Sequence, residues 1–418
     1  MSDLERRRFM LASAGVLAAV ATPAASAPVV DSGKVEGGSV DFPAWTAPTE
    51  RPAAPPPAPL PPTERVGFAV VGLGRLSLEE ILPAFGETKQ AKLVALVSGT
   101  PDKAKLVARQ YGVDPEAVYG YADFAALKNN PAIQVVYVVT PNGLHKDYVI
   151  GAVGAGKHVL CEKPMATNSA DAQAMVDAAK AAGRKLMIAY RCQYEPYNRA
   201  VQKLVRGKGF GPVAFIDAVN TQNMAAPDQW RFNKALAGGG ALPDIGLYCL
   251  NGARFMTGEE PVEITARTWS TPNDERFKEV EETVAFTLKF PSGLLANCLA
   301  SYGLHESRRM GLHAPGAAIQ FDNAFAYTGH RLMVAHRDGQ AESVDDRRLA
   351  AKNQFALEMD HMAECVRTGR EPRTPGQEGV QDHKLMEAIY RAAASGQVVK
   401  LDPVDKEDAM RGPALAEG

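Results

Sequence analysis

The fold of this chain is decided by the stretch Val66-Gly67-Phe68-Ala69-Val70-Val71-Gly72-Leu73-Gly74-Arg75-Leu76-Ser77. Its first six residues are nearly all apolar, which predicts a strand that is buried on both faces. Gly72 and Gly74 follow at once, and glycines there let the backbone approach a pyrophosphate at the start of a helix. Ser77 stands where a third glycine or alanine is usual. The stretch therefore predicts a dinucleotide-binding unit of strand, turn and helix.

Strand and helix patterns alternate after this unit. Further short apolar runs predict strands at Leu93–Val97, Val135–Val139, His158–Leu160 and Lys185–Ala189. Helical patterns lie between them, at Lys103–Tyr111, Phe124–Lys128, Tyr148–Ala155 and Ala170–Ala182. Such alternation is typical of a doubly wound parallel sheet, so we expect a Rossmann domain over residues 64–190.

The pattern changes after Tyr190. Longer alternating segments predict strands at Val262–Thr268, Thr283–Phe290 and Leu294–Ser301, and helical patterns lie at Asn198–Val205, Gln354–Val366 and Gln377–Ala393. Strands grouped with few helices between them indicate an α+β domain with an open, mostly antiparallel sheet. The predicted fold class is therefore α/β, with a Rossmann domain followed by this α+β domain over residues 191–400 and a tail over 401–418.

The N-terminus carries an export pattern. Arg6-Arg7-Arg8-Phe9-Met10 precedes an apolar run from Leu11 to Val20 that is too short to span a bilayer. We expect a twin-arginine signal over residues 1–27, cut after Ala27 or Ala24; an ordinary secretory signal is the alternative. We therefore expect the mature protein in the periplasm.

Residues 28–63 form a segment with a strong proline bias. Nine prolines lie between Pro43 and Pro62, so the segment favours extended geometry and cannot build a core. It is either a flexible spacer or an arm that lies across a neighbouring subunit.

The composition of the chain argues against several classes of binding partner. The 418 residues carry a net charge of −2, which argues against nucleic acid and anionic membranes as partners. The five cysteines are far apart, and their spacing fits neither a disulfide framework nor a zinc site. We therefore expect no metal.

The end of the second predicted strand indicates the cofactor. NAD-dependent enzymes normally place an acid there to hold the ribose hydroxyls. Here the strand ends Val97-Ser98-Gly99-Thr100, and Lys103 follows. A hydroxyl and a lysine suit a 2′-phosphate, and Arg75 adds a second cation nearby. These residues favour NADP over NAD.

Two polar clusters fall at the ends of later predicted strands. They are Thr140-Pro141-Asn142 with His145, and Cys161-Glu162-Lys163-Pro164. Open α/β sheets place their ligands at this edge, so both clusters are expected at the site.

These residues resemble the family named after glucose-fructose oxidoreductase, inositol dehydrogenase and MocA. The resemblance rests on Glu162-Lys163-Pro164, on Thr140-Pro141-Asn142 with His145, and on the second domain. The resemblance is closer to the branch that gives the family the first part of its name. The shared features are the twin-arginine signal, the proline-rich segment, and Ser98 with Lys103. Further matching motifs are Lys185–Cys192, Gln229-Trp230-Arg231, Gly238-Gly239-Gly240, Asp244–Tyr248, Asn273–Phe277 and Asn353-Gln354-Phe355. Departures from the branch are Arg75, Gly143 and Tyr197.

The resemblance implies a catalytic set of Lys163, Asp244 and Tyr248. Tyr248 would act as base in one direction and acid in the other, and the Lys163 ammonium would favour its phenolate. Asp244 lies four residues before Tyr248, on the same face if the segment is helical, and would hold a sugar hydroxyl or orient Lys163. Sugar-site candidates are Arg191, Tyr194, Trp230 and Arg231. The expected cofactor-binding residues are Gly72, Leu73, Gly74, Arg75, Ser98, Lys103, Thr140, Asn142, His145, Glu162, Lys163, Arg191, Trp230 and Arg231.

The activity implied by the resemblance is hydride transfer between two sugars through a retained NADP(H). Glucose would be oxidised to its lactone, and fructose then reduced to sorbitol at the same site. The proline-rich arm would cover the cofactor in a homo-oligomer, such as a tetramer. The alternatives are aldose–aldose exchange, a simple sugar dehydrogenase, a nicotinamide-dependent glycosidase and a non-catalytic sugar-binding protein.

Overall fold

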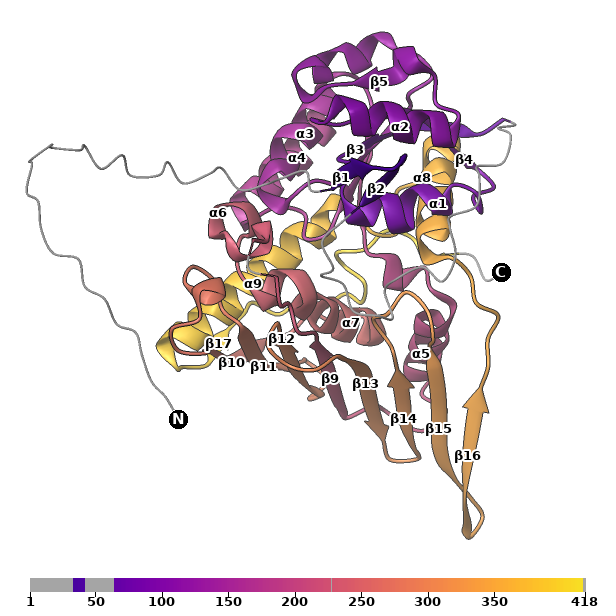
Figure 1. The fold of residues 1–418 in the computed structure, drawn as a ribbon. Helices are drawn as coiled ribbons and strands as arrows, with labels where there is room; N and C mark the ends of the chain where they lie inside the picture. Colours follow the sequence, from indigo (N-terminus) through magenta and orange to yellow (C-terminus); the bar gives the residue numbers. More distant parts are fainter. Residues whose placement is uncertain (1–32, 42–63, 227, 416–418) are drawn as a thin grey trace, which may run out of the picture.

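The computed structural model describes residues 33–41, 64–226 and 228–415, drawn in colour in Figure 1. The expected signal over residues 1–27 and most of the proline-rich segment lie outside the described residues. The part of that segment which is described forms a hairpin of β1 (Lys34–Glu36) and β2 (Ser39–Asp41). Strand β1 of this hairpin packs against helix α2 (Pro101–Tyr111) of the first domain.

Within the described residues, the first sheet has six parallel strands in the order β5-β4-β3-β6-β7-β8. The strands are β3 (Val66–Val71), β4 (Ala91–Val97), β5 (Val118–Tyr119), β6 (Val135–Val138), β7 (His158–Glu162) and β8 (Leu186–Ala189). All residues of β3, β6 and β8 are buried. The apolar runs in the sequence arise from this burial on both faces, and the predicted Rossmann architecture is confirmed.

Helical segments connect these strands. They are η2 (Ser77–Ile81), α1 (Leu82–Ala84), α2 (Pro101–Tyr111), η3 (Pro115–Ala117), η4 (Tyr121–Asn129), α3 (Asn142–Gly154) and α4 (Ser169–Ala181). A later helix, α8 (Gln354–Thr368), also belongs to this layer, because it packs on β3, β4 and β7 (Figure 1). Its first turn is capped by the Asn353 side chain, which accepts from two backbone N–H groups.

The second sheet has nine strands in the described part of the chain, in the order β16-β15-β14-β13-β9-β12-β11-β10-β17. Neighbouring strands are antiparallel except β9 and β12. The strands are β9 (Phe215–Thr221), β10 (Glu263–Trp269), β11 (Thr283–Lys289), β12 (Leu295–Ser301), β13 (Ser307–Ala314), β14 (Ala317–Asp322), β15 (Arg331–Asp338), β16 (Ala341–Arg347) and β17 (Val399–Lys400). This open, mostly antiparallel sheet confirms the predicted second domain.

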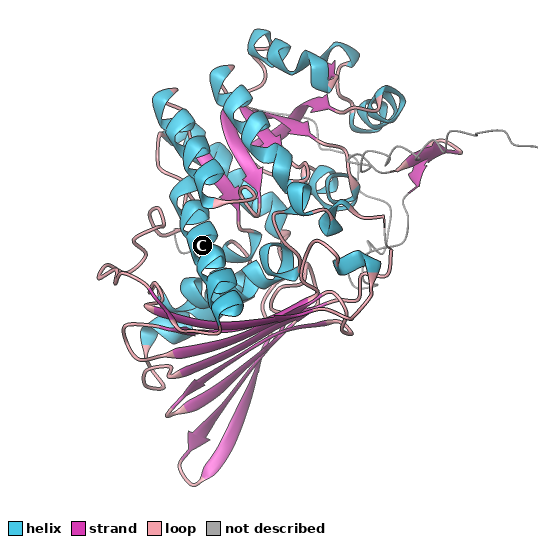
Figure 2. Cartoon of the chain, turned by 90° about the vertical axis from the view of Figure 1, so that its left-hand side faces the viewer, coloured by secondary structure: helices cyan, strands magenta, loops and turns pink. Residues whose placement is uncertain are grey.

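Helices cover one face of the second sheet, as Figure 2 shows. Helices α7 (Leu247–Thr257) and α9 (Gly376–Ser395) and the segment η7 (Leu242–Gly246) pack on its strands, and α5 (Pro196–Gly207) packs on α7. Shorter segments of this domain are η5 (Arg191–Gln193), η6 (Trp230–Phe232), α6 (Lys234–Ala237) and η8 (Glu275–Phe277). In β11, Val284, Phe286 and Leu288 are buried toward the helices, while Ala285 and Lys289 are exposed on the other face. This alternation with a period of two residues is expected of a sheet with one covered face.

Buried ion pairs fix α7 to α9. Arg254 of α7 is fully buried and pairs with Glu260 at 2.7 Å and with Asp382 of α9. Asn251 donates to Glu378 at 3.0 Å and to Asp382 at 2.9 Å. Removing one partner of such a buried pair costs about 3–5 kcal/mol, so α7 is held firmly where it meets the cavity described below.

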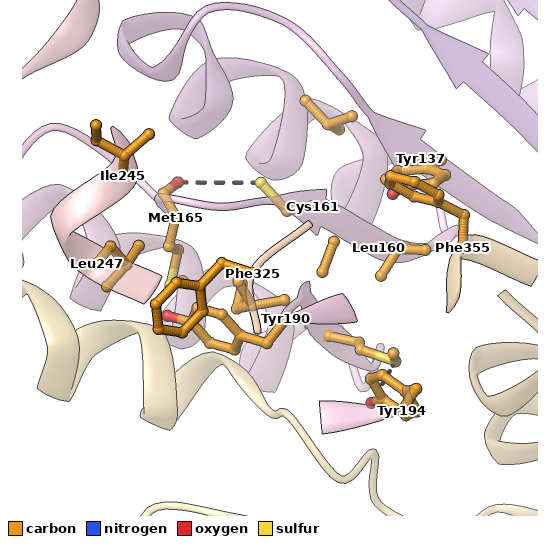
Figure 3. Packing of buried hydrophobic residues seen from close by; sticks show 14 of the residues in the cluster. Tyr137, Leu160, Cys161, Met165, Tyr190, Tyr194, Ile245, Leu247, Phe325 and Phe355 are labelled. Atoms are coloured by element: carbon orange, nitrogen blue, oxygen red, sulfur yellow. Dashed lines mark hydrogen bonds between the residues drawn. The ribbon is translucent and has the colours of Figure 1, made fainter. Parts of the chain in front are cut away.

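All five cysteines are free thiols. Burial raises the pKa of Cys161, whose Sγ lies 3.9 Å from the Met165 carbonyl oxygen (Figure 3). Among the described residues there is no cluster of side chains suited to a metal ion, and no helix is both long and apolar enough to cross a membrane.

Candidate active site

A cavity of about 770 Å³ lies where the carboxyl edge of the first sheet meets the covered face of the second. The first domain lines it with Gly72, Leu73, Gly74, Arg75, Thr140, Asn142, Glu162 and Lys163. The second domain lines it with Arg191, Asn220, Gln222, Trp230, Arg231, Asp244, Tyr248 and Arg308, among others. The hairpin adds Gly33, Lys34 and Glu36. The structure therefore brings most of the predicted site residues together.

The glycine turn fits a dinucleotide. Gly72 has a φ of +94°, and a Cβ there would lie 2.4 Å from the Val139 carbonyl oxygen, so only glycine suits the position. A Cβ at Gly74 would meet nothing within 4 Å, which leaves room for a ligand beside the backbone. The Ser77 hydroxyl donates to the Gly72 carbonyl at 2.5 Å, so serine holds the turn where a third glycine is usual.

Ser98 and Lys103 lie at the neighbouring strand end, but neither is among the described residues that line the cavity. The Ser98 hydroxyl accepts from the Thr100 N–H at 3.2 Å, and Lys103 is fully buried. Burial lowers the pKa of Lys103 to about 8, because a buried ammonium is poorly solvated. Arg75 lines the cavity and pairs with Glu79 at 2.9 Å.

His145 does not reach the cavity, which corrects the expectation that it meets the cofactor. Its ring is fully buried, with Nε2 2.8 Å from the Thr140 carbonyl oxygen and Nδ1 3.0 Å from that of Pro164. The side chain thus ties the two polar strand ends together. Asn142 lines the cavity, and its amide donates to the Ala237 carbonyl at 2.8 Å.

Lys163, Asp244 and Tyr248 meet at the centre of the cavity wall. Lys163 Nζ lies 3.0 Å from Asp244 Oδ1, 2.9 Å from the Asp244 carbonyl oxygen and 4.6 Å from the centre of the Tyr248 ring. Asp244 comes from the π-helical turn η7 and Tyr248 from the first turn of α7. Both reach the same cavity, as the spacing of four residues predicts.

The Asp244 carboxylate is held on both oxygens. Arg231 Nε lies 2.9 Å and the Tyr302 hydroxyl 2.8 Å from Oδ2, while Lys163 donates to Oδ1. Burial by itself would raise the pKa of Asp244, but the charges of Lys163 and Arg231 hold it well below its usual range. Since its oxygens are engaged, Asp244 is suited to orient Lys163 and Arg231 more than to bind a sugar hydroxyl.

Arg191 is the cation that contacts the Tyr248 oxygen. Its Nε donates to that hydroxyl at 3.2 Å, whereas Lys163 lies over the ring face. Burial raises the pKa of the Tyr248 phenol, and the charges of Arg191 and Lys163 oppose the rise without reversing it. Lys163 therefore favours the phenolate, as the sequence predicts, but Arg191 is the cation in contact with the oxygen, and burial keeps the pKa of Tyr248 above its usual value.

Tyr194, a sugar-site candidate from the sequence, lies away from the cavity. It is buried, and its hydroxyl is 2.9 Å from that of Thr374. Figure 3 shows it among the buried residues of the core. Its role is therefore structural. Trp230 and Arg231 line the cavity as expected, with the Arg231 guanidinium 4.5 Å from the centre of the Trp230 ring.

Sequence reasoning missed the contribution of β9 and β13. Arg308 is directly opposite Asn220 in the sheet, and both are buried on the helix-covered face and line the cavity. On β13 the inward positions after Arg308 are Met310 and Leu312, both buried. A charged residue in an otherwise apolar inward series was the signal that could have identified Arg308. It pairs with Glu306, and its Nη2 lies 3.3 Å from Gln222 Oε1.

This arrangement defines a class of protein: an oxidoreductase with a dinucleotide-binding Rossmann domain, followed by a domain built on an open sheet. Comparisons agree with that class. The family profile described as "Oxidoreductase family, NAD-binding Rossmann fold" matches residues 66–190, and the profile "GFO/IDH/MocA C-terminal domain" matches residues 198–320. The chain belongs to the GFO/IDH/MocA family, and its first domain is an NAD(P)-binding Rossmann domain.

Several relatives act on sugars by name. D-xylose 1-dehydrogenase (NADP(+)) of Haloarcula marismortui is 31% identical over 342 residues, which cover 81% of this chain and 93% of that protein. The solved aldose-aldose oxidoreductase of Caulobacter crescentus, complexed with glycerol, is 44% identical, with a TM-score of 0.78 over 81% of this chain and 100% of that one. A levoglucosan dehydrogenase in complex with NADH and L-sorbose is 21% identical and shares the fold, with a TM-score of 0.72 over 82% of this chain and 100% of that one.

Proposed function

We propose that this chain is a sugar oxidoreductase that retains NADP(H), oxidises an aldose to its lactone and passes the hydride to a second sugar in the same site. The observation that carries the proposal is the meeting of Lys163, Asp244 and Tyr248 with a glycine turn in one cavity. When bound, the nicotinamide would accept and return the hydride.

Tyr248 would move the proton at its hydroxyl oxygen. It would take the proton of the sugar hydroxyl during oxidation and return it to the carbonyl oxygen of the second sugar during reduction. Arg191 stabilises the phenolate through its Nε–H, and Lys163 adds positive charge over the ring. Asp244 holds Lys163 and Arg231 in place, as its two engaged oxygens indicate.

The similarity to the aldose-aldose oxidoreductase favours an aldose as the second sugar, the acceptor of the hydride. Fructose, reduced to sorbitol, is the second candidate, because the motifs quoted above resemble the branch that carries out this exchange. In either case a sugar regenerates the cofactor. This suits the proposed export, because the periplasm would supply no metabolic pool of reduced nicotinamide.

The test is to purify the mature protein and add glucose without cofactor. A rise in absorbance that corresponds to one NADPH per protein chain would support a retained cofactor. Its reversal by a second aldose or by fructose would identify the acceptor. A rise that needs added NADP would reduce the proposal to a simple dehydrogenase. Absence of a rise with glucose, xylose and other aldoses would contradict it.

We also propose export to the periplasm through the twin-arginine signal and a homo-oligomer, such as a tetramer. The hairpin of residues 33–41 lines the cavity of its own chain, which supports a cofactor-covering role for the segment around it. Cell fractionation of the full chain and of an Arg6→Lys/Arg7→Lys variant, with light scattering of the mature protein, tests both points.

Lys103 is predicted to select NADP, which requires its side chain, buried beside the cavity in this structure, to turn toward the 2′-phosphate. A Lys103→Met variant keeps the length of the side chain but loses its charge, and loss of a hydrogen bond to a phosphate costs about 1.5–3 kcal/mol, or roughly 10- to 100-fold in affinity. We expect NADP binding to weaken by that factor while NAD binding changes little, as measured by fluorescence titration of the stripped protein. An equal effect on both cofactors would remove Lys103 from the 2′-phosphate site.

The pH dependence follows from Tyr248. Because its pKa is raised, the phenol is protonated at neutral pH, and the basic form becomes more abundant as the pH rises. Stopped-flow rates of aldose oxidation should therefore increase by up to about tenfold per pH unit between about pH 6 and 9. The reductive step uses the phenol and should stay flat over this range. An oxidation rate that does not depend on pH would contradict Tyr248 as the base.

Arg308 is predicted to bind the part of the sugar that is remote from the reacting carbon. It is buried in the cavity wall, and its charge is matched by Glu306, which suits a neutral polyol. Arg308→Gln should raise KM for hexoses by about 10-fold, or ~1.4 kcal/mol, with kcat within about twofold. Glyceraldehyde, which lacks the remote hydroxyls, serves as the control substrate, and an equal KM rise for it would contradict the assignment.

A further inference from the structure

A buried tyrosine hydroxyl lies between two carboxyl groups beneath the cavity. Tyr137 of β6 is fully buried, and its Oη lies 2.7 Å from Glu162 Oε1 and 3.0 Å from Glu358 Oε1. Glu162 ends β7 and lines the cavity, whereas Glu358 comes from α8 and is fully buried. Figure 3 draws Tyr137 together with Phe355, which precedes Glu358 by almost one helical turn.

The hydrogen count of this cluster requires an additional proton. A phenol has one hydrogen, so Tyr137 can donate to only one of the two carboxyl groups. The second contact is a hydrogen bond only if that carboxyl is itself protonated and donates to the phenol oxygen. Two carboxylates on one neutral hydroxyl would also place like charges close together without water between them.

The surroundings indicate which carboxyl keeps the proton. Burial raises the pKa of Glu162, but the charges of Lys163 and Arg191 oppose the rise, and Glu162 Oε2 accepts from the Lys163 backbone N–H at 3.2 Å. Glu358 Oε2 has no hydrogen-bond partner among the described residues, and a buried ionised carboxylate with a bare oxygen is costly.

The other groups that face Glu358 also leave its protonated form favoured. Burial raises the pKa of Glu358, and the negative charge of Glu162 raises it further. Tyr137 and Arg191 act in the opposite direction but do not reverse the rise. Cys192 and Tyr194 also lie within electrostatic range, and burial raises the pKa of both, so each is neutral at neutral pH.

We propose that Glu358 is a neutral carboxylic acid at neutral pH and a positioning residue for the catalytic lysine. Its Oε1–H donates to Tyr137, Tyr137 donates to Glu162, and the Glu162 carboxylate accepts the Lys163 backbone N–H. This chain of hydrogen bonds connects α8 to the peptide that carries Lys163. The positioning role rests on the proposed function of Lys163, whereas the protonation state does not.

The first experiment locates the proton without turnover. Infrared spectra of the full mature chain at neutral pH should contain a carboxylic-acid C=O band that is lost in Glu358→Gln. The matched control is Glu364→Gln, the same substitution on the same helix at a residue paired with Arg370. The control should keep the band. An unchanged spectrum in Glu358→Gln would overturn the proposal.

The second experiment uses the pH dependence of stability. A carboxyl whose pKa is raised in the folded state binds more protons when folded, so stability falls as the pH rises above about 4.3, the unfolded pKa of glutamate. Urea unfolding should show the unfolding constant of the wild type rising by up to about tenfold per pH unit relative to Glu358→Gln. A ratio that falls with pH would show a stabilised carboxylate and overturn the proposal.

The third experiment tests positioning. Glu358→Leu cannot donate to Tyr137, and kcat for aldose oxidation should fall by about 10-fold or more, because small displacements at a reacting centre are costly. The amide of Glu358→Gln keeps a neutral donor and should restore kcat to within about twofold. Equal kcat in the two variants would limit Glu358 to a structural role. The first two measurements remain decisive even if the chain oxidises no aldose.

Discussion

Replacing Tyr248 by phenylalanine is expected to lower kcat about a thousandfold in both the oxidative and the reductive direction, within the 10²–10⁴ range of general acid–base catalysis. The variant loses only the hydroxyl, which accepts from Arg191 Nε at 3.2 Å and is the proposed proton carrier. The ring, which packs against Phe325 and under Lys163, stays in place. Cofactor binding should therefore be unchanged. Single-turnover absorbance at the NADPH band measures both directions.

Tyr327→Phe provides the matched control for this variant. Tyr327 lines the same cavity, and the Arg191 guanidinium lies 4.4 Å from the centre of its ring. Removing its hydroxyl should change kcat by less than about 10-fold, because it is not the proposed proton carrier. If Tyr248→Phe kept either half-reaction at near wild-type rate, another group would be the acid and base.

Replacing Lys163 by methionine is expected to lower kcat by about 10²–10³, the effect of removing one preorganised charged donor from an active site. The lysine Nζ lies 4.6 Å from the Tyr248 ring centre and 3.0 Å from Asp244 Oδ1, so it would add positive charge where the proposed phenolate forms. Arg231 and Tyr302 still hold Asp244. The loss of stability should therefore be below the ~3–5 kcal/mol of an unpaired buried charge.

Lys146→Met is the control for Lys163→Met. Lys146 also pairs with an aspartate, Asp171, at 2.8 Å, but the two side chains are 38% and 31% exposed. Such surface pairs contribute little to stability, and this one lies away from the cavity lining, so kcat should stay unchanged. Retention of kcat in Lys163→Met, with an intact fold by circular dichroism, would remove Lys163 from the catalytic set.

The first domain was predicted well because its strands are buried on both faces. Continuous apolar runs such as Val66–Val71 mark such strands directly, and the structure places β3 at these residues. In the second sheet the strands with regular alternation, such as β11, were found. Strands β9 and β13 to β17 were not predicted. In β9 and β13 the cavity-facing positions Asn220 and Arg308 are polar, so the inward residues of these strands do not form a continuous apolar series.

Some residues of the candidate site could also be predicted from local sequence, whereas others could not. Gly72 was predictable because a local turn demands its backbone geometry, and Lys163 because it follows a strand end. The contact of Asp244 with Lys163 was predicted from the resemblance, but its contact with Tyr302, 58 residues away in the sequence, was not. His145 and Tyr194 resembled site residues, yet each satisfies hydrogen bonds within the interior.

The two-domain fold and the glycine turn follow from the sequence, because local periodicity and short motifs carry that information. The candidates Lys163, Asp244 and Tyr248 came from the family resemblance of the motifs that contain them. Tertiary packing is what brings Arg191, 57 residues from Tyr248, to the Tyr248 hydroxyl and Glu358 of α8 to Tyr137. The physical reason is that charge interactions in a buried site depend on distances of a few ångströms, and these distances are set by packing between elements that are remote in the sequence.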